Sequence, residues 1–297
     1  MPSISLDLAR PLDVAATLRT TVGKAVGRVQ GGAGGAWWVE RTPEGAVSLR
    51  VDLVAGRVEA EGFGPGSAWA LDHLPDLLGL GDDPDGFDPP PGALRDLHHR
   101  AGGLRMGHSG LVWSALLPAV LGQRVTGEEA HREYHAVVRA HGEPAPGPVE
   151  SWVPPPPEVV AGLRYEDLHP LGVERARAST VIEAARRIGR LGAITGLGFE
   201  DGYRRLGAVR GIGPWTAGIV MGAACGDPDA VPIGDYHLPN LVAWVLAGEP
   251  RADDDRMLAL LEPYRGHRRR VVALLERSGI KAPSYGPRRA VRRIEST

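Results

Sequence analysis

Apolar and polar residues alternate over residues 47–53 of this chain. A period of two is typical of a strand that buries one face. Residues 36–41 and 57–63 have a similar β-type composition, and turn residues rich in glycine separate the three segments. The pattern predicts a small antiparallel sheet near the start of the chain, whereas residues 1–11 show no clear periodicity.

Most of the later patterns favour helices. Residues 109–123 are apolar on nearly every side, which predicts a helix in the middle of a core. Thr126 with Glu129 three residues later forms a capping box at the start of the next helix. Further helices are expected over residues 13–22, 67–80, 173–188, 199–209, 214–224, 236–246 and 257–261. Four arginines of the 173–188 helix are expected to form a solvated face: Arg175, Arg177, Arg186 and Arg187.

An acidic, proline-rich stretch at residues 81–92 separates the strand-like part from the helical part. We therefore predict an α+β fold class with two domains. Residues 1–88 would form an N-terminal domain with an antiparallel sheet and helices, acting as a scaffold. Residues 89–297 would form an all-α domain.

Composition narrows the class of protein. The chain has 297 residues and a single cysteine, Cys225, which excludes a disulfide, a structural zinc cluster and a four-cysteine iron–sulfur cluster. No apolar run is long enough to span a bilayer and no signal pattern opens the chain, so a cytoplasmic protein is expected.

The formal net charge is only −2, but basic residues are concentrated in one segment of the chain. Residues 264–293 hold ten basic residues against one acidic residue, Glu276. Arg268 and Arg269 open an apolar-periodic helix within this segment, which fits contacts to a phosphate backbone.

The most informative motif of the helical part lies in residues 206–239. A helix pattern breaks at Gly211-Ile212-Gly213 and restarts with Pro214 in the first helical position, where proline loses no hydrogen bond. Two glycines allow a tight turn, and the N–H groups that begin the second helix can bind an anion. Asp235 follows after a second turn and precedes the next helix. Asp227 and Asp229 are interpreted as turn formers.

This order of hairpin, Trp215-Thr216-Ala217 and V-P-I-G-D resembles the helix-hairpin-helix/Gly-Pro-Asp superfamily of DNA glycosylases, and within it the AlkA-type DNA-3-methyladenine glycosylases. The resemblance covers nearly the whole chain. It implies a helix-hairpin-helix over residues 199–224, duplex DNA with a damaged base as the partner, a nucleoid-associated location and a monomer. It implies no cofactor, and leaves open a monovalent cation (Na⁺ or K⁺) at the hairpin backbone near Gly211 and Gly213.

The resemblance also assigns roles to single residues. The loop at residues 121–130 resembles the one that enters the opened duplex: Gln123 matches the motif glutamine, and Arg124 stands where family members place an apolar wedge. The expected DNA contacts are Gln123, Arg124, Gly211, Ile212, Gly213, Thr216, Arg268 and Arg269. The expected base pocket comprises Trp215, Tyr236, Trp113 and His267, and a core role is the alternative for Trp113. The chain departs from the family pattern at Ile219 and His267, where further aromatics are usual.

The chemistry expected is hydrolysis of an N-glycosidic bond. Asp235 would stabilise the positive charge that develops on the sugar and orient or deprotonate the attacking water. Strand-cutting glycosylases need an amine nucleophile, but Lys24 and Lys281 are the only lysines, and Trp215 stands where lyase members carry one. A monofunctional glycosylase is therefore predicted. The alternatives are an oxidised- or deaminated-purine glycosylase, a non-catalytic lesion-binding protein and a structural DNA clamp.

Overall fold

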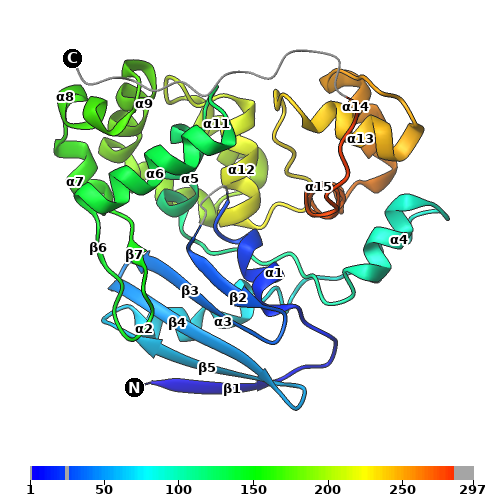
Figure 1. The fold of residues 1–297 in the computed structure, drawn as a ribbon, viewed down its shortest axis with the longest axis horizontal. Coiled ribbons are helices and arrows are strands. Elements are labelled where there is room, and N and C mark those ends of the chain that lie inside the picture. Colours follow the sequence, from blue (N-terminus) through cyan, green and yellow to red (C-terminus); the bar gives the residue numbers. More distant parts are fainter. Residues whose placement is uncertain (1, 24–26, 284–297) are drawn as a thin grey trace.

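The structure is a computed structural model that describes residues 2–23 and 27–283 (Figure 1). Its first part is a five-stranded sheet in the order β1-β5-β4-β3-β2, with every neighbouring pair antiparallel. The strands are β1 (Ser3–Asp7), β2 (Val29–Gly32), β3 (Gly35–Thr42), β4 (Gly45–Val54) and β5 (Arg57–Phe63). The predicted alternation is confirmed in β4, where Val47, Leu49 and Val51 are buried. The sheet and the many helices make a mixed α and β protein.

Short helices cover the sheet. The predicted helix α1 (Val14–Thr20) packs on β2 and β3, and the side chain of Asp13 caps it by accepting a hydrogen bond from the Ala16 N–H. The segment predicted as one helix over 67–80 forms two, α2 (Ser67–Asp72) and α3 (Leu74–Leu77), since Pro75 begins a new first turn. Strand β1 was not predicted, although Ile4 and Leu6 alternate with polar residues, because the pattern covers only five residues; the strand lies at the edge of the sheet and is largely exposed.

The rest of the chain is helical, with one short strand pair, β6 and β7 (Figure 1). None of the described helices has the length and apolarity needed to cross a membrane. The remaining elements are α4 (Ala93–Arg100), α5 (Val112–Leu121), α6 (Gly127–His141), β6 (Glu143–Pro144), β7 (Trp152–Val153), α7 (Pro157–Gly162), α8 (Tyr165–Leu168), η1 (His169–Leu171), α9 (Arg175–Arg186), α10 (Ile188–Gly192), η2 (Ala193–Gly196), α11 (Phe199–Gly207), α12 (Pro214–Cys225), α13 (Leu238–Ala247), α14 (Asp254–Leu261), η3 (Glu262–Tyr264) and α15 (Arg268–Arg277).

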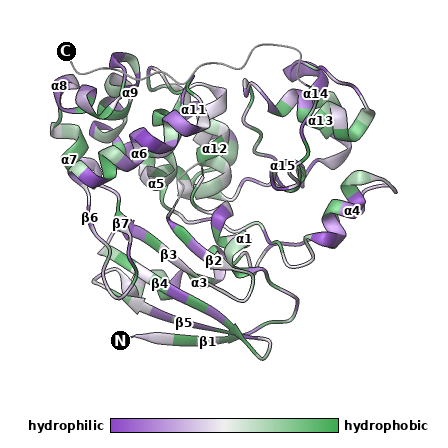
Figure 2. Cartoon of the chain, viewed as in Figure 1, coloured by the Kyte–Doolittle hydropathy of each residue, from purple (hydrophilic) through white to green (hydrophobic). Residues whose placement is uncertain are grey.

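The helices form two groups above the sheet. Helices α5 to α12 gather on one side and α13 to α15 on the other (Figure 1). Every residue of α5 is buried, as its apolar pattern predicts, and α5 packs against α12 and α9. In Figure 2, α12 is green to white, whereas the outer helix α6 carries purple segments. The capping box predicted at Thr126 and Glu129 is present at the start of α6.

A buried guanidinium joins the sheet to the central helix α5. The Arg28 guanidinium pairs with Glu40 in the sheet and donates hydrogen bonds to the carbonyls of Val22, 3.1 Å away, and Ser114 in α5, 2.6 Å away. One hydrophobic cluster likewise contains residues of the sheet and of α5. The sheet and the central helix are therefore packed as one body, and the division at residue 88 stays a prediction.

The solvated arginine face predicted for α9 needs one correction. Arg177 is only 4 % exposed, pairs with Glu133 of α6 and donates to the Leu121 carbonyl, 2.6 Å away. A guanidinium has five donors, and here a carboxylate and the uncapped end of α5 satisfy several of them inside the protein. This arginine fixes the end of α5 against α6 and α9.

Candidate active site

The hairpin between α11 and α12 contains two glycines with different structural roles. Gly211 has a φ of 91°, and a Cβ there would lie 2.1 Å from Oγ1 of Thr180 in α9. Gly213 has an extended backbone with a φ of −97°, and no atom lies within 4 Å of a Cβ placed on it. The fold therefore requires glycine at 211, whereas at 213 it leaves open space outside the turn.

The first N–H groups of α12 have no side-chain cap, because Gly213 occupies the N-cap position. Such groups point outward at the positive end of the helix dipole and are a favourable place for a phosphate. The Ile212 side chain is 5 % exposed and packs in the main core cluster. The part of the hairpin tip that can meet a partner is thus its backbone.

The loop between α5 and α6 is tied to this hairpin. The amide nitrogen Nε2 of Gln123 donates to the Gly211 carbonyl at 2.9 Å and to Oγ1 of Thr216 at 2.8 Å. A Cβ placed on Gly122 would lie 3.6 Å from the Trp215 ring. The structure therefore brings together two segments that the sequence analysis had assigned separately to DNA, although the Thr216 side chain itself is buried.

Arg124 stands at the tip of the same loop. It is exposed and has a φ of 57°, one of two described residues other than glycine with a positive φ. The left-handed conformation costs a residue with a Cβ about 1–2 kcal/mol. Within the described part of the chain, the Arg124 guanidinium has no hydrogen bond or ion pair to hold it. The fold thus displays a free cation beside the hairpin.

Asp235 combines two structural roles. One carboxylate oxygen, Oδ1, accepts hydrogen bonds from the backbone N–H groups of His237 and Leu238, at 2.9 and 3.0 Å, at the start of α13. The other oxygen, Oδ2, accepts the indole Nε1–H of Trp215 at 2.9 Å. Both side chains are half-buried. The carboxylate is thereby held beside the first turn of α12, next to the candidate phosphate site.

Of the two other acids predicted to form turns, Asp227 does so, whereas Asp229 bonds a segment that is distant in sequence. Oδ1 of Asp227 accepts from the Asp229 N–H at 2.9 Å, and its Oδ2 accepts from the Tyr203 hydroxyl at 2.8 Å. Asp229 accepts the Gly266 N–H at 2.7 Å. Both carboxylates are bound at the far end of α12, so Asp235 remains the acid beside the hairpin.

Comparison with known proteins finds relatives of similar sequence and solved structures of the same fold. A 3-methyladenine DNA-glycosylase from Archaeoglobus fulgidus superposes with a TM-score of 0.76 at 20 % identity, covering 93 % of this chain and 98 % of that one. The Bacillus subtilis protein YfjP, provisionally named a DNA-3-methyladenine glycosylase, is 29 % identical over 160 residues, which is 52 % of this chain and 55 % of that protein. A second Bacillus subtilis protein, named DNA-3-methyladenine glycosylase, is 29 % identical over 159 residues, or 52 % of each chain.

The chain is similar in sequence and in fold to DNA glycosylases. No protein-family model matches it. It spans about half the length of the curated relatives it matches.

Not every predicted residue of this glycosylase fold lies near Asp235. Trp113 is 7 % exposed and donates its Nε1–H to the Pro155 carbonyl at 2.9 Å, so it is a core residue and not part of a base pocket. Tyr236 is 83 % exposed, with its ring edge-on to His237. Its ring, next to Asp235 in the chain, is therefore free to meet a bound molecule.

The basic helix α15 also requires a correction. Arg269, predicted to bind DNA, is 8 % exposed and donates to the carbonyls of Thr20 and Gly107, both at 2.9 Å. Burial lowers its pKa to about 10. Arg268 is largely covered and pairs with Glu262. The Arg269 guanidinium thus caps backbone carbonyls and that of Arg268 pairs with a carboxylate of the same fold. The basic residues from 284 onward lie outside the described residues.

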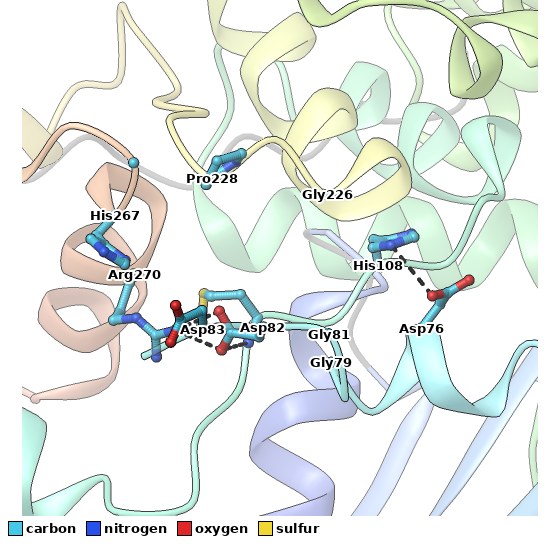
Figure 3. Close-up of a pocket in the computed structure, with 12 residues that line it drawn as sticks. Asp76, Gly79, Gly81, Asp82, Asp83, His108, Gly226, Pro228, His267 and Arg270 are labelled. Carbon is cyan, nitrogen blue, oxygen red and sulfur yellow. Dashed lines mark hydrogen bonds and ion pairs between the residues drawn. The ribbon is translucent and has the colours of Figure 1, made fainter. Parts of the chain in front are cut away.

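A cavity of about 380 Å³ lies at the other end of α12 (Figure 3). Arg270 pairs with both carboxylate oxygens of Asp82 at 2.6 Å, and His108 faces Asp76 at 3.8 Å. Burial lowers the pKa of His108. His267, predicted for the base pocket, lines this cavity. Because α12 has 12 residues, the cavity is roughly 18 Å along the helix from the hairpin, so His267 is not beside Asp235.

Proposed function

We propose that this protein is a DNA glycosylase that removes alkylated, 3-methyladenine-like bases from duplex DNA by hydrolysis and leaves the strand intact. The observation that carries the proposal is the position of Asp235, fixed by Trp215 and the start of α13 beside an uncapped helix N-terminus. The names of the relatives support the alkylated substrate class.

Each part of this arrangement has a task in the reaction. A base inside a duplex hides its glycosidic bond, so the nucleotide must be extruded, at a cost of a few kcal/mol. Phosphate contacts at the N-terminus of α12 and insertion of the Gln123–Arg124 loop would offset that cost. Cleavage then develops positive charge on the sugar, and Asp235 would stabilise it and direct the attacking water.

The partner in this proposal is duplex DNA containing a damaged base, bound by a monomer at the nucleoid. A Na⁺ or K⁺ ion at the Gly211–Gly213 backbone remains part of the proposal, since carbonyl groups of a hairpin suit such a cation. In domain terms, residues 1–88 would act as scaffold and residues 89–297 as the catalytic helical part.

The experiment that tests the function is excision from a panel of duplexes, each with one modified base. Products are resolved with and without hot alkali, and a parallel reaction contains borohydride. We expect base release that yields strand breaks only after alkali, because Trp215 and not an amine follows the hairpin. A borohydride-trapped covalent complex would contradict the monofunctional reaction. Release of an oxidised or deaminated purine alone would reassign the lesion class, and binding without release would indicate a lesion-binding protein.

Trp215→Phe tests whether the indole positions Asp235. The phenyl ring keeps an aromatic face but removes the Nε1–H that bonds Oδ2. We expect the single-turnover excision rate to fall roughly tenfold or more, the scale of one hydrogen bond to a charged group, with unchanged affinity for an abasic-site duplex. Trp113→Phe is the matched control, since its indole bonds the Pro155 carbonyl in the core. It should lower the melting temperature and leave the rate unchanged. Equal rates for both variants would remove the positioning role of Trp215.

A further inference from the structure

The turn that leads into Asp235 is held by an acid from a different helix, Asp254 in α14. We propose that Asp254 is a positioning residue for Asp235, because it fixes the peptide between Ile233 and Gly234 and with it the place of the carboxylate. This inference rests on the proposed function, since the exact placement of the carboxylate matters to the reaction only if Asp235 acts on the sugar.

Asp235 is the last residue of a tight turn. Its backbone N–H donates to the Pro232 carbonyl at 3.2 Å, which closes a turn of four residues. Gly234, the third of them, has a φ of 91°, as that position of a type II turn requires. The start of the turn lies against α12, where a Cβ placed on Gly218 would be 2.5 Å from the Val231 carbonyl oxygen. The end of the turn is held by the hydrogen bonds of the Asp235 side chain.

The middle of this turn contains an N–H group that the turn itself leaves without an acceptor. The hydrogen bond between the first and last residues of a turn uses neither polar group of the central peptide. That peptide carries the N–H of Gly234, which donates to Oδ1 of Asp254 at 3.1 Å. Turns of types I and II differ by a rotation of this same peptide. The Asp254 carboxylate therefore holds the orientation in which Gly234 has its positive φ.

Helix α14 is anchored, so it gives Asp254 a fixed position. Helices α13 and α14 pack against each other (Figure 1), and Met257 and Leu261 of α14 are fully buried in a cluster shared with α13. Just before α14, the Ala252 N–H donates to Oδ1 of Asn240 in α13 at 2.9 Å. The acceptor for the turn is therefore attached to the same packed unit as the helix that Asp235 precedes.

An effect of the Asp254 charge alone is the competing role. A second carboxylate near the sugar would also favour positive charge there, but it would act through its field and not through the turn. Asparagine separates the two roles, because its Oδ1 can accept the same N–H without a charge. Asp255 provides the matched comparison, since it lies in the same helical turn, is exposed and has no hydrogen bond or ion pair among the described residues.

The test measures single-turnover base release from the duplex of the modified-base panel that reacts fastest, together with affinity for a duplex that carries a tetrahydrofuran abasic analogue. We expect Asp254→Ala to slow release about tenfold at unchanged affinity, because small misplacements of a reacting group can cost up to about 10²-fold in rate. Asp254→Asn should keep most of the wild-type rate. Asp255→Ala should lower the melting temperature about as much as Asp254→Ala, through the same helix dipole, and release base at the wild-type rate.

Gly234→Ala reaches the same turn without changing any acid. No atom lies within 4 Å of a Cβ placed on Gly234, so alanine would act only through its aversion to a positive φ. We expect release to slow as it does in Asp254→Ala, again with unchanged affinity for the abasic duplex. A wild-type rate in Gly234→Ala would show that the form of the turn does not matter to Asp235, and would overturn the inference.

The double variant Asp235→Asn/Asp254→Ala tests whether Asp254 acts through Asp235. Residues that act as a unit are not additive, so the double variant should release base as slowly as Asp235→Asn alone. A further tenfold loss in the double variant would reveal an independent effect and overturn the inference. Two other results would also overturn it: Asp254→Asn as slow as Asp254→Ala, or Asp254→Ala as fast as Asp255→Ala.

Failure of this inference is distinct from failure of the proposed function. In each result that overturns the positioning role, the wild type still releases base and Asp235→Asn is still slow. If the wild type releases no base from any duplex, the proposed function is wrong. If Asp235→Asn releases base at the wild-type rate, the catalytic assignment is wrong, and the positioning role of Asp254 is wrong with it.

Discussion

Asp235→Asn is expected to slow single-turnover base release by roughly 10² or more, the scale of losing one preorganised electrostatic group. The carboxylate is proposed to act only as charge develops on the sugar, so its effect belongs to the transition state and not to binding. Asparagine keeps one oxygen, which can still accept the N–H groups of His237 and Leu238. Affinity for an abasic-site duplex and the melting temperature should therefore stay close to wild type.

The same substitution at another helix cap provides the control. Asp253 caps α14 by accepting the Arg256 N–H at 2.9 Å, and it belongs to no part of the proposed site. Asp253→Asn should excise bases at the wild-type rate. If Asp235→Asn is no slower than Asp253→Asn, Asp235 is a helix cap and the catalytic assignment is wrong.

Gly213→Val is expected to weaken binding to damaged and undamaged duplexes alike, by at least about tenfold. The new side chain would project into open space at the α12 N-terminus and keep a phosphate away from the N–H groups. The extended backbone of Gly213 suits valine, so the fold should lose only about 1 kcal/mol, because valine is a poorer N-cap residue than glycine. Anisotropy titrations and thermal melting measure the two effects.

Gly211→Ala should instead act mainly on the stability of the fold. Its positive φ and the approach of Thr180 to 2.1 Å require the turn to move. We expect a clear loss of thermal stability, by more than the ~1 kcal/mol of a left-handed alanine alone. If Gly213→Val binds DNA like the wild type while remaining folded, the hairpin is not the phosphate contact.

Several features of the site could be predicted from local sequence. The Gly211-Ile212-Gly213 break, Pro214 at the start of α12 and the capping box of Thr126 each depend on neighbouring residues, and each is present in the structure. The burial of α5 follows equally from its uniform apolarity. Turn and capping chemistry acts over a few positions, so one sequence is enough to find it.

The partners of polar side chains could not be predicted in this way. Arg177 and Arg269 look like surface residues in the sequence. In the structure Arg177 reaches a carbonyl and a carboxylate, and Arg269 reaches two carbonyls, all supplied by distant elements. The Trp215–Asp235 hydrogen bond joins two residues that were proposed for separate roles, stacking and catalysis. His267, the N-cap residue of α15, lines a cavity together with Gly226 and Pro228, which follow the other end of α12. Such pairings are set by tertiary packing, which no local pattern encodes.

The hydrogen bond from Arg269 to the Thr20 carbonyl spans 249 positions of the chain. During synthesis α1 leaves the ribosome long before α15. Until α15 emerges, Arg269 is not available and the Thr20 carbonyl lacks its final hydrogen-bond donor. Contacts of such long range also slow folding, because a large loop must close before they form. The nascent protein therefore cannot complete its fold until nearly all of its residues have left the ribosome, and a chaperone would have its longest opportunity to bind in that interval.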